Sequence, residues 1–231
     1  MSELAGKTIL VVGANGAFGS GISDALLNAG ASVLGTARNA ETSSRLRPDL
    51  TARLLLDLED RGSIKVLTNY LNTQPAALDG IILASGLVGF GPIEQTSADL
   101  VTRLMQVNAL GQIDLTQRLM PKLVSSAQAE RAPFVLSISG VIAEAPMPGL
   151  AAYSASKTAL HGYAQAAAKE LRKSGIRWLD ARPGHTESGL AGRALFGTAP
   201  NFGSGMSVEH VVDRIIKGII DDERDLPSTA F

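Results

Sequence analysis

The sequence predicts a single α/β domain built on a doubly wound parallel sheet. Short apolar runs rich in β-branched residues alternate with helical patterns along the chain. A glycine-rich segment, residues 12–19, lies between the first such run and the first helical pattern. The 231 residues contain no internal repeat or linker, and 45% of them are hydrophobic. One domain spanning residues 1–231 therefore has enough apolar side chains for a core.

In the first half of the chain, strand-like runs and helical patterns follow one another. Residues 7–12 form a β-branched run that is too short for a stable helix and ends at Gly13. From Ala17 the apolar side chains recur at helical spacing until Gly30, where a left-handed conformation can stop a helix. The pattern continues with predicted strands at 31–36, 53–56 and 80–84 and a predicted helix at 63–71.

The second half keeps the same alternation. It predicts helices at 97–123 and 151–173 and strands at 134–138 and 176–181. Ser207 is the predicted N-cap of a last helix. One stripe of that helix is apolar, which is typical of core packing, and consists of Val208, Val211, Val212, Ile215, Ile216 and Ile219. Short apolar strands between amphipathic helices are typical of a parallel sheet covered on both faces, with right-handed crossovers.

Residues 187–206 form the one long irregular stretch in this prediction. A structureless segment of such length inside a compact domain is often a lid over a binding site. We expect a substrate lid with an apolar inner surface, although the same side chains could instead cover the core. Those side chains are Leu190, Leu195, Phe196, Phe202 and Met206. His185, just before the segment, either reaches the site or is a solvated loop residue.

The bulk composition excludes several classes of partner. The net charge of -1 gives no field that would concentrate nucleic acid or an anionic membrane surface. With no cysteine and three scattered histidines, we expect no metal site and no cysteine nucleophile. No apolar run approaches the length of a membrane span, and the first residues lack a leader pattern, so we expect a cytoplasmic protein without a membrane partner.

Gly13, Gly16 and Gly19 follow the first predicted strand and open the first predicted helix. A turn at this place is tight, lets the backbone approach a ligand, and aims free N–H groups and the positive end of the helix dipole at an anion. This combination suits a pyrophosphate and indicates a dinucleotide site. The alternative interpretation is a glycine-rich turn without a ligand.

Tyr153 and Lys157 lie near the start of the alanine-rich helix at 151–173. Their spacing of four places both side chains on one helical face. An ammonium stabilises the ionised form of a neighbouring phenol, so we expect the pKa of Tyr153 to be lowered toward the range of a general acid/base. The alternative is a pair that merely decorates the surface.

Taken together, these motifs resemble the short-chain dehydrogenase/reductase family along nearly the whole chain. Gly13, Ala17 and Gly19 occupy the three small positions of the family's glycine turn, with Val12 replacing its Thr. Tyr153 and Lys157 match the family's Tyr-x-x-x-Lys in order and spacing. Three further matches are Asp57 in Leu-Asp-Leu, Asn108 in Val-Asn-Ala-Leu-Gly, and the pair Pro183 and Gly184 after the sixth strand.

The resemblance implies a Rossmann fold, a nicotinamide cofactor and a catalytic role for several residues. Tyr153 would exchange a proton with the substrate oxygen, Lys157 would hold the nicotinamide ribose, and Asn108 would bind a water that connects Lys157 to solvent. Ser188, or nearby Thr186, would contact the carboxamide. The full set implied to bind the cofactor is Gly13, Asn15, Gly16, Ala17, Phe18, Gly19, Arg38, Asp57, Leu58, Ala84, Ser85, Gly86, Asn108, Tyr153, Lys157, Pro183, Gly184, Thr186 and Ser188.

Three departures from the family pattern matter. Residues 83–86 read Leu-Ala-Ser-Gly where the family has Asn-Asn-Ala-Gly, and we expect structural compensation. The family's catalytic serine position falls on Gly140 without a gap, whereas a one-residue insertion in the following loop would restore Ser139, which we take as the catalytic serine. A missing donor costs about 2–4 kcal/mol of transition-state stabilisation in comparable sites. The chain also ends at Phe231 without a clear copy of the family's closing strand.

The end of the second predicted strand predicts the choice of nicotinamide. Ala37 stands where an acid would bond the ribose of NAD, and Arg38 can bind a 2′-phosphate through charge-assisted hydrogen bonds. NADP is therefore the expected cofactor. If Arg38 only stacks on the adenine, NAD would also be usable.

The sequence thus predicts an NADP-preferring oxidoreductase that transfers a hydride between nicotinamide and a small, partly apolar carbonyl or alcohol. We expect a homo-oligomer, a dimer or tetramer, by the same resemblance. The main alternative is a weak or inactive relative that binds the cofactor as a redox-sensing regulator, which Gly140 would favour. An epimerase or dehydratase would need a larger portion beyond the sixth strand.

Overall fold

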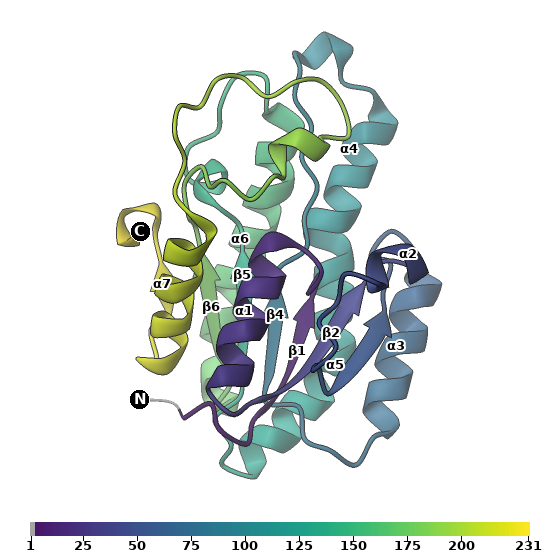
Figure 1. Ribbon diagram of the computed structural model, residues 1–231, viewed down its shortest axis with the longest axis vertical. Helices are drawn as coiled ribbons and strands as arrows, with labels where there is room; N and C mark the ends of the chain where they lie inside the picture. The colour runs from purple at the N-terminus through teal and green to yellow at the C-terminus, as the bar shows by residue number, and fades with distance from the viewer. Residues whose placement is uncertain (1–2) are drawn as a thin grey trace.

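Strand β1 (Thr8–Val12) is an inner strand, third in order, of a seven-stranded, all-parallel sheet in the computed structural model, which describes residues 3–231. The strands follow the order β3-β2-β1-β4-β5-β6-β7 (Figure 1). The other strands are β2 (Ser32–Ala37), β3 (Ala52–Leu55), β4 (Gly80–Leu83), β5 (Phe134–Ile138), β6 (Arg177–Ala181) and β7 (Asp225–Leu226).

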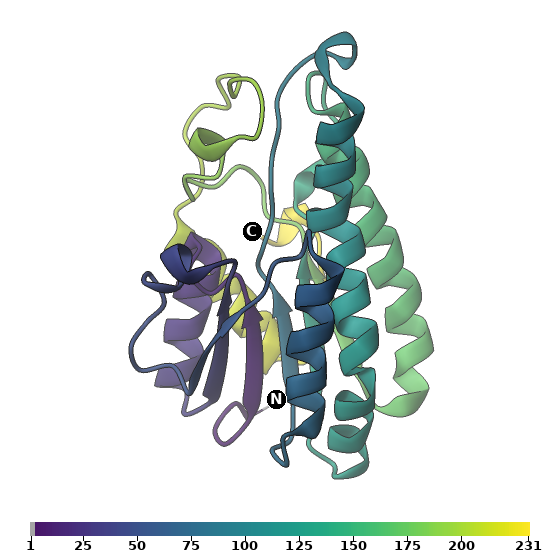
Figure 2. The same ribbon diagram turned by 90° about the vertical axis from the view of Figure 1, so that its right-hand side faces the viewer.

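Helices cover both faces of the sheet, as Figure 2 shows. Helices α1 (Ala17–Asn28) and α7 (Val208–Ile220) pack together on one face. Helices α3 (Arg61–Thr73), α5 (Gly111–Gln128) and α6 (Ala151–Leu171) cover the other. Alternate residues of a strand point to opposite faces, so Ile9 and Val11 of β1 join one core while Leu10 and Val12 join the other. The predicted doubly wound sheet in one domain is confirmed.

The sheet order places a crevice between the ends of β1 and β4. From β1 the chain first builds β2 and β3 on one side and then crosses to build β4 to β7 on the other. In open α/β sheets, ligands bind outside the carboxyl ends of the strands where the order reverses. Gly13 after β1 and Ala84 after β4 lie at this point.

Most predicted elements are found within a few residues of their expected bounds. Ser207 caps α7 by accepting a hydrogen bond from the His210 N–H at 3.1 Å, as predicted. The apolar stripe of α7 is core, with Val211, Ile215 and Ile219 fully buried. Gly30 adopts φ +81°, consistent with the left-handed stop expected after the first helix.

Two predictions about elements were wrong. The predicted helix 97–123 is divided into α4 (Ala98–Met105), a π-helical turn (Gln106–Leu110) and α5. The expectation that the chain has no closing strand is corrected by β7, which pairs in parallel with β6 through Asp180↔Asp225 and Ala181↔Leu226. Two residues give too little pattern for sequence analysis to detect. The short helix α2 (Ala40–Ser43), with its Asn39 capping box, was also missed.

The segment 187–206 is anchored to the domain at both ends. Its only regular element is the short 3₁₀ turn Ala191–Arg193. Thr186 pairs with Met206 at the base of the segment. Further along, the Leu195 N–H donates to the Val88 carbonyl at 2.8 Å, and the Phe90 N–H donates to the Phe196 carbonyl at 2.8 Å. These bonds hold the segment above the carboxyl ends of the strands (Figure 1).

Candidate active site

A cavity of about 630 Å³ lies at the carboxyl ends of the strands and under the segment 187–206. Its volume is within the range of ligand-binding clefts. All predicted site residues line it except Gly19 and Asn108, which lie directly behind its wall. The lining groups that the sequence analysis did not single out include Thr42, Arg45, Glu59, Leu87, Val88, Phe90, Ile142, Leu150 and Arg193.

The glycine turn fits a diphosphate. Gly13 has φ +80°, and a Cβ there would lie 2.4 Å from the Ser85 Oγ. A Cβ at Gly19 would lie 2.1 Å from the Gly13 carbonyl oxygen, so only glycine lets α1 start this close to the turn. No side chain caps the helix start at Gly16. Backbone N–H groups at an uncapped helix start, together with the helix dipole, form a site for an anion.

Two arginines line the cavity beyond β2. Arg38 follows the strand directly, and the α2 turn brings Arg45 and Thr42 to the same wall. The nearby acid Glu59 is bound by the Arg103 guanidinium, with 2.7 Å between Nε and Oε1. That hydrogen bond holds the pKa of Glu59 below its ordinary value. Arg38 and Arg45 therefore leave this end of the cavity suited to a phosphate. Sequence reasoning missed Arg45 because α2 was not predicted.

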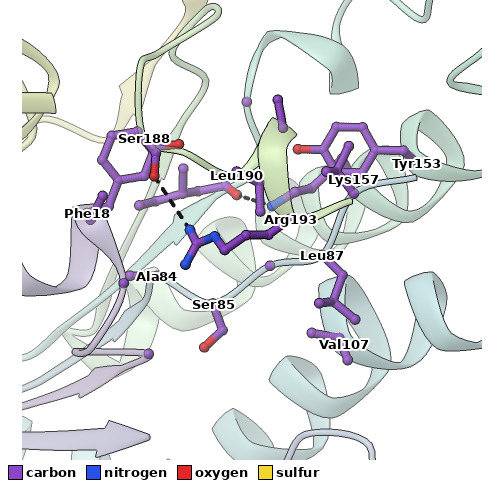
Figure 3. Close-up of a pocket in the computed structure, with 18 of the residues that line it drawn as sticks. Phe18, Ala84, Ser85, Leu87, Val107, Tyr153, Lys157, Ser188, Leu190 and Arg193 are labelled. Atoms are coloured by element: carbon purple, nitrogen blue, oxygen red, sulfur yellow. Dashed lines mark hydrogen bonds between the residues drawn. The ribbon is translucent and has the colours of Figure 1, made fainter. Parts of the chain in front are cut away.

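Tyr153 and Lys157 lie one helical turn apart at the start of α6, and both face the cavity (Figure 3). The Lys157 ammonium is buried and donates to the Ile138 carbonyl at 2.7 Å. Burial lowers the pKa of Lys157 to about 8, against the opposing effect of the Asp180 carboxylate. Lys157 therefore stays protonated at neutral pH and can lose its proton just above it.

The expected lowering of the Tyr153 pKa is not found. Burial raises the pKa of Tyr153 to about 12, because the surrounding apolar groups penalise the phenolate. The prediction counted the ammonium of Lys157 and left out desolvation. The phenol is consequently protonated at neutral pH, which is the form that a general acid needs.

Asn108 lies in the π-helical turn and is fully buried. Its amide donates to the Leu87 carbonyl at 2.8 Å and to the Ser156 Oγ at 2.9 Å, and its oxygen accepts from the Leu87 N–H at 2.8 Å. A Cβ at Gly86 would lie 3.4 Å from the Asn108 Oδ1 and 3.5 Å from the Lys157 Nζ. Asn108 thus holds the loop after β4 close beside Lys157. Such π-helical turns are frequent at functional sites.

The hydroxyl of Ser139 is directed at a buried carboxylate. Ser139 Oγ donates to Asp180 Oδ2 at 2.6 Å, and its side chain is fully buried although the residue borders the cavity. Gly140 adopts φ +79°, and a Cβ there would lie 3.7 Å from the Pro183 carbonyl oxygen. In this conformation the hydroxyl hydrogen of Ser139 is bonded to Asp180, so it cannot be donated to a substrate oxygen.

Asp180 is the centre of a polar cluster that sequence reasoning missed. Its carboxylate accepts from Ser137 Oγ at 2.5 Å, is 2.8 Å from His161 Nδ1, and is 3.2 Å from an Arg182 nitrogen. His161 follows Lys157 by one turn of α6, so the cluster lies behind Tyr153 and Lys157. The only signal in the sequence was one acidic residue in an otherwise apolar strand pattern.

The altered segment 83–86 is compensated by a side chain from α5. The buried Gln112 donates from Nε2 to the Ser85 carbonyl at 3.0 Å and to the Val107 carbonyl at 3.0 Å. The bond to Ser85 joins the loop after β4 to the helix layer. It takes the place of the side-chain hydrogen bonds that the asparagines of the family pattern would supply.

The half of the cavity beyond Tyr153 is apolar. The buried residues Val88, Phe90, Ile142 and Leu150 form a cluster there, and Tyr153, Leu190 and Phe202 pack against it. His185 reaches this wall, with its ring centroid 5.0 Å from that of Phe202 and its Nε2 3.5 Å from the Glu187 carboxylate. Pro183, Gly184, Thr186 and Ser188 line the cavity on the way to the glycine turn.

The described residues, 3–231, have neither a metal-binding group nor a membrane-spanning helix. They contain no group of His, Cys, Asp and Glu side chains that could hold a metal ion. None of their helices is long and apolar enough to cross a membrane.

Comparisons with known proteins agree with this geometry. Residues 7–195 match the family described as short chain dehydrogenase. A "Dehydrogenase/reductase SDR family protein 7-like" from Anopheles gambiae is 28% identical over 97% of this chain and 75% of its own. The 2,3-dihydro-2,3-dihydroxybenzoate dehydrogenase of Escherichia coli is 28% identical over 81% of this chain and 73% of its own.

Solved structures show the same fold. A short chain dehydrogenase from Burkholderia cenocepacia in complex with NADP has a TM-score of 0.82 at 22% identity, covering 100% of this chain and 91% of that one. A 3-ketoacyl-(acyl-carrier-protein) reductase from Brucella melitensis complexed with NADH has a TM-score of 0.86 at 19% identity, covering 98% and 99%. The predicted class, an NAD(P)-dependent oxidoreductase, is confirmed. The chain belongs to the short chain dehydrogenase family.

Proposed function

We propose that this protein is an NADP-preferring oxidoreductase that interconverts a small, partly apolar carbonyl compound and its alcohol. The observation that carries the proposal is the pair Tyr153 and Lys157, set one turn apart in a cavity that continues to the glycine turn. A bound nicotinamide would supply or accept the hydride.

In this proposal, the residues of the chain orient the reactants and move one proton. In reduction, the phenol of Tyr153 donates its proton to the substrate oxygen, and its raised pKa keeps it protonated until then. Lys157 holds the ribose hydroxyls with its ammonium and afterwards gives a proton to the Tyr153 phenolate. It regains that proton from solvent through a water bound at Asn108. Thr186 or Ser188 contacts the carboxamide. The apolar cluster beyond Tyr153 receives the substrate and excludes water.

The preference for NADP rests on charge at the end of β2. Arg38 and Arg45 both line the cavity, and Glu59, an acid of the same lining, is bound by Arg103. A 2′-phosphate there would gain charge-assisted hydrogen bonds, whereas NAD would lack that group. We further propose that the enzyme works as a cytoplasmic homo-oligomer and that residues 187–206 serve as its substrate lid.

A second candidate function is that of a redox-sensing regulator with weak or no turnover. The hydrogen bond from Ser139 to Asp180, together with glycine at position 140, favours it, because no serine hydroxyl then faces the substrate oxygen. If Ser139 is the catalytic serine, its hydroxyl must rotate away from Asp180 when substrate binds.

Turnover distinguishes the two functions. We expect the purified protein to oxidise NADPH in the presence of at least one member of a panel of apolar aldehydes and ketones. Tyr153→Phe should abolish this activity and still bind NADPH, because the phenyl ring keeps the packing and loses only the proton. Binding without turnover on every substrate of the panel would favour the regulator.

A further inference from the structure

The segment 187–206 carries a single arginine, Arg193, at the end of the turn Ala191–Arg193. Figure 3 shows its side chain in the cavity, with the guanidinium between Ser188 and Ala84. Its Nε donates to the Gly189 carbonyl at 3.1 Å and its Nη2 to the Ser188 carbonyl at 3.5 Å. Both partners belong to the same segment, so Arg193 makes no bond across the cleft.

Arg193 is not neutralised by an acid in the part of the chain that the structure describes. Glu187, the one acid of the segment, faces His185 and accepts from the Gly205 N–H at 2.9 Å. By contrast, Arg103 is paired with Glu59, and Arg182 with Asp225. A guanidinium presents five N–H donors, and most of those of Arg193 remain free for a ligand.

The anchoring of the segment directs this charge inward. The turn that bears Arg193 lies between the Thr186–Met206 pairing and the bonds of Leu195 and Phe196 to the loop after β4. The guanidinium therefore lies over the strand ends, on the side of Phe18 and Ala84, where α1 begins (Figure 3). The segment thus faces the anion site of the glycine turn with a cation.

We infer that Arg193 is an anion-binding residue that fastens the segment 187–206 over the cleft by bonding an oxyanion above the glycine turn. The ligand chemistry is a phosphate or carboxylate oxygen. Its two possible sources are the diphosphate of the cofactor and a carboxylate on the substrate, and the position next to Phe18 favours the diphosphate. This inference rests on the proposed function.

The test compares Arg193→Gln with Arg193→Lys and with Arg172→Gln. Arg172 is an exposed arginine outside the cavity and serves as the matched control. We expect NADPH to bind Arg193→Gln roughly tenfold more weakly in an equilibrium fluorescence titration, because one charge-assisted contact is lost. The NADPH affinity of Arg193→Lys should lie between those of the wild type and Arg193→Gln, and that of Arg172→Gln should equal the wild-type affinity. Added salt should weaken binding to the wild type more than binding to Arg193→Gln.

A second assay identifies the source of the oxyanion. Turnover of a 2-oxo acid is compared with turnover of its neutral methyl ester, at saturating NADPH. If Arg193→Gln binds NADPH as tightly as the wild type does, while its kcat/KM falls roughly tenfold for the acid but not for the ester, Arg193 binds the substrate carboxylate. Unchanged NADPH affinity and an unchanged acid-to-ester ratio would overturn the inference and leave the proposed function intact. A wild type that binds no nicotinamide dinucleotide would overturn both.

Discussion

Burial shifts the two titrating side chains of the site toward their neutral forms. It raises the pKa of Tyr153 to about 12 and lowers that of Lys157 to about 8, where Asp180 opposes the shift. At neutral pH both groups carry their protons. As the pH rises through about 8, Lys157 loses its charge first, while Tyr153 keeps its proton over the whole physiological range.

This order predicts a pH dependence of cofactor binding. Dinucleotide phosphates are anionic, and we expect the affinity for NADPH to decline as the pH rises through about 8, because the cation of Lys157 disappears. In Lys157→Met the affinity should be lower and should show no step at this pH. Binding titrations between pH 6.5 and 9.5, about 1.5 units on either side of that pKa, measure the pH dependence of NADPH affinity for the wild type and for Lys157→Met. A step of the same size in Lys157→Met would assign the titration to another group.

Asp180 should be worth more to stability than an acid on the surface. Replacing it by Asn removes a charge that His161, Arg182, Ser137 and Ser139 all face. Breaking a buried ion pair from one side costs about 3–5 kcal/mol. We expect a loss of that order in urea unfolding of Asp180→Asn. Asp49→Asn, which removes an exposed partner of Arg47, is the control and should change stability little.

Among the elements, the strands and long helices could be predicted because their apolar residues repeat with a clear period. The π-helical turn Gln106–Leu110 could not, because it inserts one residue without interrupting the helical pattern. Strand β7 is two residues long and is held by Arg182, which binds Asp225 across 43 positions. Contacts of this kind depend on tertiary structure and leave no local signal.

The candidate site could be predicted as far as its motifs extend. Gly13, Tyr153 and Lys157 lie in short patterns whose spacing follows from a turn or a helix, and the structure places all three on one cavity. The direction of the Tyr153 pKa and the partner of Ser139 were missed because both depend on neighbours far away in sequence. Arg193 was missed because nothing in the sequence indicates which way a loop side chain points.

The anchoring of the segment 187–206 can be tested at one glycine. Gly197 has φ +68°, and a Cβ there would lie 1.8 Å from the Phe90 carbonyl oxygen. Gly197→Ala should therefore separate the segment from the loop after β4, and we expect faster limited proteolysis of residues 187–206 and a higher KM for substrate. Gly192→Ala is the matched control, because its Cβ would meet nothing within 4 Å. Equal protease sensitivity of the two variants would show that the contact does not anchor the segment.

At the amino ends of the strands, opposite the cavity, Asp79 holds several parts of the fold together. This fully buried acid precedes β4, accepts from the Thr8 N–H at the start of β1, and binds Arg131 after α5 at 2.6 Å. Desolvation would raise the pKa of Asp79, but the hydrogen bonds from Arg131, Ser126 and Thr8 outweigh it and lower the pKa below its ordinary value. One side chain thus joins three segments that are distant in sequence.

A carboxyl group whose pKa is lower in the folded than in the unfolded state makes the fold more stable at high pH than at low pH. The contribution of Asp79 is fully present above the ordinary carboxyl pKa and is lost as the pH falls through its lower, folded value. Asp79→Asn should lower Tm at neutral pH by about 6–12 °C, taking about 3 kcal/mol for the broken pair. It should also lose less stability on acidification than the wild type does. Parallel declines with falling pH would contradict this role.

The proposed function requires above all that the cavity between the glycine turn and Tyr153 holds a nicotinamide dinucleotide. Equilibrium titration of the purified protein with NADPH and, in parallel, NADH tests it most directly. We predict saturable binding of both, with NADPH the tighter ligand because Arg38 and Arg45 meet its additional phosphate. Absence of binding by either dinucleotide at millimolar concentration would contradict the claim.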